Sequence, residues 1–252
     1  MNYTNPFRRF LFRKDLYKRI RVRLACYKRR LTKNEMSDLV CLFQDENPEI
    51  IFDVGANVGF LAWQFTKAFR KAIVYALEPD PVPLGVLQAA HGANPQIRIY
   101  PVAAADRDGE RAFVQRTVSC NSSLLEAAAG EGGNTEHTIK VAACTLDGFC
   151  AKNSISHIHL LKTDTEGADL LVLQGARNLL AQGCIDAVMI EVFFVPTYKG
   201  QSTFDEIAGF LRSYGFGLFN VYIASETNYR QARYGNAIFV GQRLQQALGK
   251  AR

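Results

Sequence analysis

The sequence predicts an α/β fold: a seven-stranded, mostly parallel sheet with helices on both faces and an antiparallel hairpin at its C-terminal end. Two observations lead to this prediction. Apolar runs rich in β-branched residues alternate with helical patterns, and parallel strands need such crossover connections. The last two strands have no helix between them, so they should form a hairpin at one edge of the sheet. A final hairpin departs from the dinucleotide-binding fold of six parallel strands.

The individual elements follow from the spacing of apolar residues. Each predicted strand is a short apolar run, and in each predicted helix the apolar residues recur every three or four positions. Strands are expected near residues 50–54, 72–77, 97–102, 157–163, 185–192, 216–223 and 234–240. Helices are expected near residues 58–70, 81–90, 167–181 and 202–214.

The alternation lapses over residues 106–145, between the third and fourth strands. Asp108-Gly109 marks a turn, and residues 127–134 have the composition of a flexible loop. The runs at 111–115 and 137–142 suggest extra strands. An insertion of this length is more often functional than ornamental, so we expect it to contribute to a site.

The N-terminal part of the chain is strongly basic. Residues 1–33 contain twelve Lys or Arg and one acid, a net charge of +11, so the remainder carries −5 of the total of +6. Apolar residues at steps near three and four predict a helix with one apolar stripe and a cationic back. We therefore divide the chain into a basic amphipathic helical extension, residues 1–45, and a folded domain, residues 46–245. The apolar stripe comprises Phe10, Tyr17, Ile20, Leu24, Tyr27 and Leu31.

The basic helix has two interpretations. It docks on the domain while its charges stay in solvent, as most surface helices do. Alternatively, it contacts anionic lipid headgroups or an acidic partner. The second interpretation would place the protein peripherally at the inner face of a membrane. Nucleic acid is not expected as a partner, because no recognised reading motif accompanies the charge.

The composition favours a cytoplasmic location. No run of about 18 uncharged apolar residues occurs that would span a membrane. Cations interrupt the first residues every two or three positions, unlike a secretory signal. The six cysteines form no C-x-x-C pair, so we expect free thiols and neither a zinc site nor disulfides.

A turn with two glycines connects the first strand to the first helix, in the order Asp53-x-Gly55-x-Asn57-x-Gly59. Glycines in such a turn let a ligand approach the backbone, and a dinucleotide site would have Gly at the position of Asn57. Asp53 would repel a diphosphate, but it can accept hydrogen bonds from a cationic amino-acid ligand, directly or through water. S-adenosylmethionine fits this description, because it has an ammonium, a sulfonium and no phosphate.

A second acid, Glu78, ends the next strand, where a carboxylate can accept hydrogen bonds from both hydroxyls of an adenosine ribose. Together with the turn it favours an S-adenosylmethionine site over a tight turn with a polar strand end. The candidate cofactor-binding residues are Asp53, Gly55, Asn57, Gly59, Glu78, Asp80 and Ala104.

Several ordered segments carry a family resemblance: "FDVGANVG", "YALEPDP", "PVAAADRDGERAF", "NSSL", "TLDGF", "LLKTDTEGADLLVLQGA", "IDAVMIEV" and "YGNAIFVG". On these segments the chain, from Ile50 to about Gln242, resembles the FkbM family of S-adenosylmethionine-dependent methyltransferases. The resemblance implies a Rossmann-like class I methyltransferase fold and methylation of hydroxyls on sugars, polyketides or other small natural products. One departure is Asp169, where the family often has Glu, and it preserves the charge.

Three acids lie at the ends of the fourth and fifth strands of the sheet: Asp164 and Glu166 follow the fourth strand, and Glu191 lies near the end of the fifth. Ligands lie beyond the carboxyl ends of strands in such sheets. The three carboxylates could deprotonate an alcohol, hold an acceptor sugar, or bind Mg²⁺. We favour Asp164 as base or acceptor-positioning group with Glu166 and Glu191 as helpers, although Glu166 is equally well explained as a cap of the next helix. Lys162 is expected to pair with one of these acids in a structural role.

Two histidines, His157 and His159, alternate on one face of a strand. No third ligand is adjacent in the sequence, and zinc normally needs three or four, so we interpret them as a structural pair and predict no metal site there. Ser122 and Ser123 belong either to an acceptor or cofactor loop or to an ordinary turn.

The sequence therefore predicts an S-adenosylmethionine-dependent O-methyltransferase that acts on a sugar hydroxyl of a glycan or lipid-linked oligosaccharide. The rhizobial Nod-factor fucose 2-O-methyltransferases are one candidate group, which would imply a role in nodulation. The alternatives are a methyltransferase of a polyketide or other small natural product, an NAD-dependent oxidoreductase, and a non-catalytic module with a cofactor pocket. Asn57 and the terminal hairpin disfavour the oxidoreductase.

Overall fold

The computed structural model describes residues 34–44, 46–116, 121–128 and 136–250. The chain divides into two units, residues 1–47 and 48–252. In the first unit, helix α2 (Glu35–Leu42) begins after Asn34, whose side chain accepts a hydrogen bond from the Met36 N–H at 2.9 Å. The amphipathic helix predicted for residues 1–33 lies outside the described residues.

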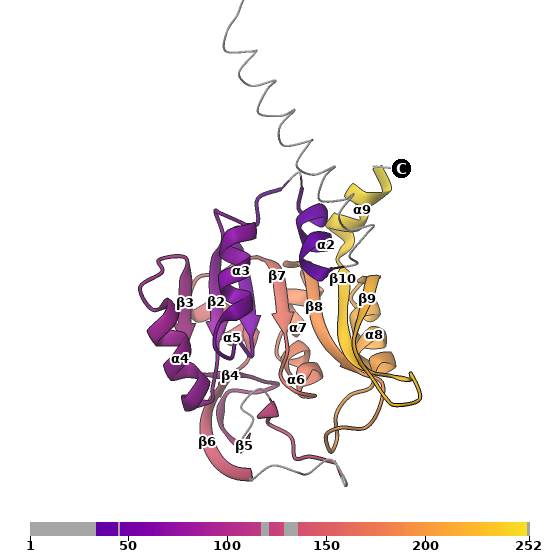
Figure 1. Cartoon of the computed structure of the whole chain (residues 1–252). Coiled ribbons are helices and arrows are strands. Elements are labelled where there is room, and N and C mark those ends of the chain that lie inside the picture. The colour runs from indigo at the N-terminus through magenta and orange to yellow at the C-terminus, as the bar shows by residue number, and fades with distance from the viewer. Residues whose placement is uncertain (1–33, 45, 117–120, 129–135, 251–252) are drawn as a thin grey trace, which may run out of the picture. The chain divides into compact units, whose positions relative to one another are not determined.

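In the second unit the described residues form a seven-stranded sheet with the order β3-β2-β1-β7-β8-β10-β9 (Figure 1). Strand β10 is antiparallel to both β8 and β9, and the other neighbouring pairs are parallel. The predicted sheet with a C-terminal hairpin at one edge is therefore confirmed. The strands are β1 (Ile50–Val54), β2 (Ile73–Leu77), β3 (Ile97–Tyr100), β7 (Ile158–Thr163), β8 (Ile185–Phe193), β9 (Gly217–Glu226) and β10 (Ala232–Val240).

Helices cover both faces of this sheet, as predicted, and Figure 1 shows α3 and α5 on opposite faces. On the α5 side, the Phe149 ring packs edge-on against the rings of Phe52 and Tyr100, with centroids 5.7 and 4.8 Å away. All nine residues of β8 are buried, which explains its nearly unbroken apolar sequence. The helices of this unit are α3 (Phe60–Ala68), α4 (Pro81–His91), α5 (Leu146–Lys152), α6 (Asp169–Gln174), α7 (Arg177–Ala181), α8 (Phe204–Ser213) and α9 (Gln242–Lys250).

The single helix predicted over residues 167–181 is wrong, because α6 and α7 are separate. The carboxylate of Asp147, on α5, accepts hydrogen bonds from the N–H groups of Asn178 and Leu179 at 2.9 and 3.0 Å. The Gly175 carbonyl accepts from the Asp147 N–H instead of continuing the helix. A side chain distant in sequence thus provides the N-terminal cap of α7.

The insertion and the segment just before it form a small sheet with the order β4-β6-β5, which Figure 1 shows beyond the carboxyl ends of β1, β2 and β3. The two extra strands suggested by the sequence are confirmed as β5 and β6, and the short β4 was not predicted. The strands are β4 (Ala103–Ala104), β5 (Gly109–Arg116) and β6 (Glu136–Cys144). No helix in the part of the chain that the structure describes has the length and apolar character needed to cross a membrane.

Candidate functional site

A cavity of about 290 Å³ lies at the carboxyl ends of β1, β2 and β7, where the sequence places the cofactor turn and the acids. The candidate residues that line it are Gly55, Asn57, Glu78, Ala104, Asp164 and Glu166. Val102, Phe113 and Leu124 add an apolar wall from the insertion and the segment before it. The cavity therefore joins the predicted cofactor turn to two of the three predicted catalytic acids.

The glycine turn is shaped by three left-handed residues: Gly55, Asn57 and Gly59 have φ of +72°, +50° and +84°. Asparagine tolerates this region better than most side chains, which accounts for Asn57 without reference to a phosphate. At Gly55 an added Cβ would lie 1.9 Å from the backbone oxygen of Asp164. The turn and the strand end that carries the acid are thus in backbone contact, and only glycine fits between them.

Glu78 is held against the turn by two backbone groups. Its carboxylate accepts hydrogen bonds from the N–H groups of Asn57 and Asp80, at 2.7 and 2.8 Å. Burial raises the pKa of Glu78 to about 7, because the charged form loses its solvation. Glu78 thus fixes the turn and presents a carboxyl group to the cavity.

Three of the cofactor candidates lie outside the cavity lining: Asp53, Gly59 and Asp80. Asp80 caps α4 by accepting from the Val82 N–H at 3.0 Å, and it also accepts from the Gln115 side chain at 2.8 Å. Asp53 has no exposed surface. Its carboxylate therefore does not face the cavity directly, in contrast to the direct contact that the sequence allowed.

Asp53 is connected to the cavity by Lys162, whose side chain is part of the cavity lining. The Lys162 ammonium lies 3.0 Å from a carboxylate oxygen of Asp53, 3.5 Å from one of Asp164, and 3.2 Å from the Gly55 carbonyl oxygen. The expected pairing of Lys162 with one of the three acids is confirmed for Asp164. The sequence did not indicate that the same lysine also holds Asp53 and the turn.

The three predicted catalytic acids converge. Carboxylate oxygens of Asp164, Glu166 and Glu191 all lie within 4.8 Å of one another. Burial, followed by the negative charge of Asp164, raises the pKa of Glu166 to about 8. Burial also raises the pKa of Glu191, and the charges of Asp164 and Glu166 raise it further. The cluster thus contains two acids that tend to keep a proton beside Asp164.

Glu166 does not act as a helix cap. Among the described residues, no side chain caps α6, and the Glu166 carboxylate instead accepts a hydrogen bond from the Tyr198 hydroxyl. Glu166 itself has φ of +55°, a conformation that is uncommon outside glycine. The alternative interpretation of Glu166 as a cap is therefore wrong, and its side chain belongs to the acid cluster.

Tyr198, in the loop after β8, also belongs to the site, although it was not among the residues predicted from the sequence. The Arg116 guanidinium stacks over the Tyr198 ring at 5.3 Å, and an isolated β-bridge joins Ala127 to Tyr198. The Ser123 hydroxyl donates to the Glu166 carbonyl oxygen at 2.8 Å and accepts from the Leu125 N–H at 3.0 Å, so this serine contacts the acid segment and also makes an ordinary turn. The insertion and the loop after β8 together cover the acid cluster, a long-range contact with no sequence signal.

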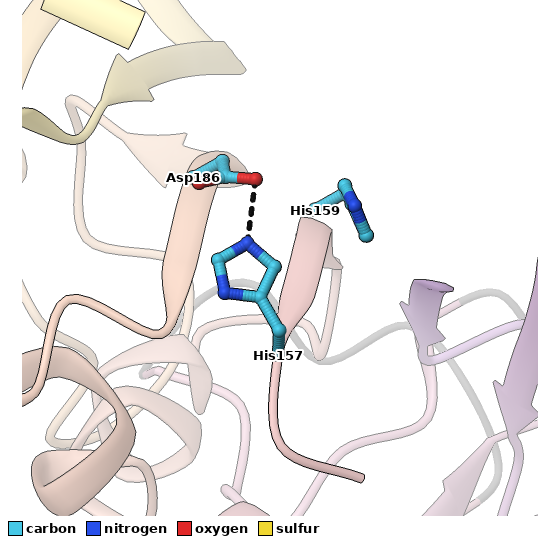
Figure 2. Close-up of side chains that lie close together, drawn as sticks. All are labelled: His157, His159 and Asp186. Atoms are coloured by element: carbon cyan, nitrogen blue, oxygen red, sulfur yellow. Dashed lines mark hydrogen bonds and ion pairs between the residues drawn. The ribbon is translucent and has the colours of Figure 1, made fainter. Parts of the chain in front are cut away.

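His157 and His159 lie at the amino ends of the strands, near Asp186 (Figure 2). His157 Nε2 is 2.7 Å from Asp186, the His159 ring packs edge-on against the His157 ring with centroids 4.9 Å apart, and His159 Nδ1 accepts from the Ile50 N–H at 3.3 Å. The Arg243 guanidinium bonds both carboxylate oxygens of Asp186. A cation would have to displace Arg243 from this carboxylate, so we retain the interpretation of a structural pair.

Replacing Asp186 by alanine is expected to lower the free energy of unfolding by about 1–3 kcal/mol. The change removes a buried carboxylate that connects α9 to β8 through Arg243 and also bonds His157. The Arg243 side chain is 47% exposed, and this solvent access keeps the expected loss below that of a fully buried ion pair. Urea unfolding followed by circular dichroism measures it.

The matched control is Glu110→Ala, which removes an acid paired with Lys140 at 3.3 Å on the surface. Both side chains are at least 70% exposed, so we expect a change below about 0.5 kcal/mol. Equal losses in the two variants would contradict the proposed structural role of Asp186.

Comparison with known proteins agrees with this geometry. The family model described as the methyltransferase FkbM domain matches residues 53–218. The 2-O-methyltransferase NoeI of Sinorhizobium fredii is 24% identical over 155 residues, which cover 57% of this chain and 63% of NoeI. The 31-O-demethyl-FK506 methyltransferase FkbM of Streptomyces tacrolimicus is 24% identical over 195 residues, 67% of this chain and 72% of that protein.

A solved structure gives the same fold. A methyltransferase FkbM from Methylobacillus flagellatus KT aligns with a TM-score of 0.51 and 14% identity, over 77% of this chain and 44% of that chain. The chain thus spans less than two thirds of NoeI and less than half of this structural relative. Because the family model covers more than half of the sequence, the chain belongs to the methyltransferase FkbM domain family.

Proposed function

We propose that this protein transfers a methyl group from S-adenosylmethionine to a sugar hydroxyl of a glycan or lipid-linked oligosaccharide. The observation that carries the proposal is the single cavity that joins the glycine turn and Glu78 to Asp164 and Glu166. The names of two relatives, a 2-O-methyltransferase and an O-demethyl-FK506 methyltransferase, support transfer to oxygen.

The cavity residues fit S-adenosylmethionine. Glu78 presents a carboxyl group for ribose hydroxyls, and the turn at Gly55 leaves room that a Cβ would fill. The cofactor supplies an electrophilic methyl group bound to a sulfonium. The protein supplies the orientation of the acceptor hydroxyl and a group that accepts its proton.

The three acids have different surroundings, and we assign proton acceptance and orientation of the acceptor to different members on that basis. Asp164, with 34% of its side chain exposed and Lys162 beside it, is the proposed proton acceptor. Glu166, whose pKa is raised to about 8, keeps a proton near neutral pH, and burial raises the pKa of Glu191 as well. In their protonated forms these acids can donate hydrogen bonds to acceptor oxygens. Neighbouring acids whose pKa values are pushed apart often have different roles in catalysis.

A sugar acceptor suits this polar cluster, because its neighbouring hydroxyls can bond several carboxyl groups and the Tyr198 hydroxyl at once. By analogy with NoeI, whose name is that of a 2-O-methyltransferase, we propose 2-O-methylation. The resemblance seen in the sequence makes fucose on a Nod factor the candidate acceptor. The second candidate is a hydroxyl of a polyketide or another small natural product. The apolar wall of Val102, Phe113 and Leu124 favours it, as does the FK506 relative.

The basic segment, residues 1–33, supports a further proposal on location: a cytoplasmic protein held peripherally at the inner membrane face. A lipid-linked acceptor would lie within reach of such a protein. Vesicles of anionic lipid should retain the full chain, and a chain lacking residues 1–33 should be lost from them. Equal retention of both chains would contradict the membrane contact.

The function is tested by incubating the protein with methyl-labelled S-adenosylmethionine and a panel of acceptors. The panel contains fucosylated oligosaccharides, lipid-linked oligosaccharides and a macrolide alcohol. We expect the label on a sugar oxygen, located by mass spectrometry of the product. Label only on the macrolide would select the second candidate. Binding without transfer to any member would favour a non-catalytic module, and calorimetric binding of NAD in place of S-adenosylmethionine would favour an oxidoreductase.

The same assay separates two roles of the acid cluster. A proton-accepting Asp164 predicts transfer that continues in excess EDTA. Loss of transfer in EDTA with recovery on adding Mg²⁺ would instead make the three acids cation ligands, since carboxylate oxygens are the ligands that Mg²⁺ prefers.

The affinity for S-adenosylmethionine is expected to rise with pH through neutrality. Ribose hydroxyls donate to the ionised form of Glu78, and the pKa of this residue in the free protein is raised by burial to about 7. Below that pH a proton must be released before binding, so the affinity at about pH 6 should be up to about tenfold weaker than at about pH 8. Isothermal calorimetry at several pH values measures this dependence.

Two variants test whether Glu78 causes this pH dependence. Glu78→Gln, which resembles the protonated acid, should bind weakly and with a flat pH profile. Glu166→Gln should keep the slope, because Glu166 lies on the acceptor side. An unchanged slope in the Glu78 variant would show that another group controls binding.

A further inference from the structure

Two acids share one lysine at the base of the cavity. Asp53 on β1 and Lys162 on β7 are direct neighbours in the parallel sheet, and Figure 1 shows the two strands side by side. The Lys162 ammonium lies 3.0 Å from Asp53 and 3.5 Å from Asp164. The side chains of Lys162 and Asp53 are 3% and 0% exposed, so water screens their charges little.

The three groups together carry one surplus negative charge. Burial lowers the pKa of Lys162, but the two adjacent carboxylates outweigh burial and raise it, so the lysine stays charged. Burial raises the pKa of Asp53, and the Lys162 ammonium 3.0 Å away opposes this rise. We take Asp53 as ionised on the geometry, because a protonated carboxyl would leave the buried lysine charge with a weaker partner. We therefore count one cation and two anions in direct contact, and the charge of Asp169, which also raises the pKa of Lys162, adds to the negative surroundings.

The proposed methyl donor and its product differ in charge. S-adenosylmethionine carries an ammonium, a carboxylate and a sulfonium, a net charge of +1, and S-adenosylhomocysteine lacks the sulfonium and is neutral. The proposed function brings the sulfur-bound methyl to an acceptor oxygen that Asp164 must reach. The two ligands would thus differ in charge at the sulfur, next to the acceptor oxygen that Asp164 must reach.

We propose that Asp53, Lys162 and Asp164 form a charge-selective group that makes the site prefer the cationic methyl donor over its neutral product. This inference rests on the proposed function. Lys162 and Asp53 act as positioning and selectivity residues, since they set the charge that the ligand meets without reacting.

Bonds and charges both balance when the methyl group is transferred at this site. The carbon–sulfur bond of the donor breaks with its electron pair passing to sulfur, a carbon–oxygen bond forms, and the hydroxyl proton passes to Asp164. The ligand loses its positive charge as Asp164 loses its negative charge, which leaves Asp53 and Lys162 as a balanced pair. Release of that proton to water restores the surplus negative charge, and the site again favours the donor over the product.

The test measures the ratio of the dissociation constants of S-adenosylhomocysteine and S-adenosylmethionine by calorimetry at fixed pH. Asp53→Asn keeps the side-chain shape and removes the surplus charge, so the ratio should fall about tenfold, as expected for one unit charge a few ångströms away in a partly screened site. In the double variant Asp53→Asn with Lys162→Gln, Asp164 alone remains charged, and the ratio should return to the wild-type value or exceed it. Sinefungin, an analogue with an amine in place of the sulfonium, should follow S-adenosylmethionine in every variant.

A purely structural role predicts a different result. Both variants would then weaken the two ligands in parallel and leave the ratio unchanged, which would overturn the proposal. If Asp53→Asn does not fold, Asp164→Asn tests the same prediction from the exposed side of the group and should also lower the ratio. Glu110→Gln removes a surface acid that is 70% exposed and should not change the ratio. Failure of the wild-type protein to bind S-adenosylmethionine at all would reject the proposed function instead.

Discussion

Replacing Asp164 by asparagine is expected to lower the rate of methyl transfer by about two to four orders of magnitude. Asparagine keeps the shape of the side chain but cannot accept the proton that the acceptor hydroxyl must lose. Asp164 lines the cavity and has 34% of its side chain exposed, so an acceptor hydroxyl can reach it. Single-turnover transfer of labelled methyl measures the loss without interference from product release.

S-adenosylmethionine should still bind to this variant, with an affinity reduced by no more than about tenfold through the lost charge. The comparison variant is Glu166→Gln. Because the pKa of Glu166 is raised to about 8, glutamine resembles the form that prevails near neutral pH, and transfer should stay within about tenfold of the wild type. A reversed order, with Glu166→Gln inactive and Asp164→Asn active, would make Glu166 the proton acceptor.

The sheet was predictable because its strands are encoded locally. Short apolar runs with turn residues at their ends define all seven strands, and the missing crossover before the last strand defines the hairpin. The break between α6 and α7 was not predictable, since it depends on the Asp147 carboxylate, about 30 residues earlier in the chain. Helices α5 and α9 were also missed, the first because residues 106–145 obscure the pattern before it.

In the candidate site, too, locally encoded features were predictable and long-range contacts were not. Acids at the ends of parallel strands meet at one edge of the sheet, so Asp164, Glu166 and Glu191 were predictable as a cluster. Tyr198 was not predictable as part of the site, because a loop brings its hydroxyl to Glu166 and no local sequence pattern marks it. The sequence also could not show that Asp53 is wholly buried. Strand alternation gives the face of a side chain, whereas burial depends on what packs against that face.

Replacing Gly55 by alanine should abolish measurable binding of S-adenosylmethionine, a loss of at least about 100-fold, and lower the free energy of unfolding by about 2–4 kcal/mol. The new Cβ would lie 1.9 Å from the Asp164 carbonyl oxygen and 2.9 Å from its carbon, both backbone atoms that no rotamer change can move. The φ of +72° adds the strain of a left-handed alanine. Relief requires β1 and β7 to separate at the ends that form the cavity. Calorimetry and urea unfolding measure the two effects.

Gly85, in the exposed middle of α4, provides the matched control. Among the described residues, no atom lies within 4 Å of a Cβ added there, and its φ is not in the left-handed region. Gly85→Ala should leave cofactor binding unchanged and raise the free energy of unfolding by about 0.5–1 kcal/mol, because alanine is the better helix former. Normal binding by Gly55→Ala would mean that the turn and the end of β7 can move apart without loss of the cofactor site. The close contact between Gly55 and Asp164 would then no longer explain why glycine occupies this position.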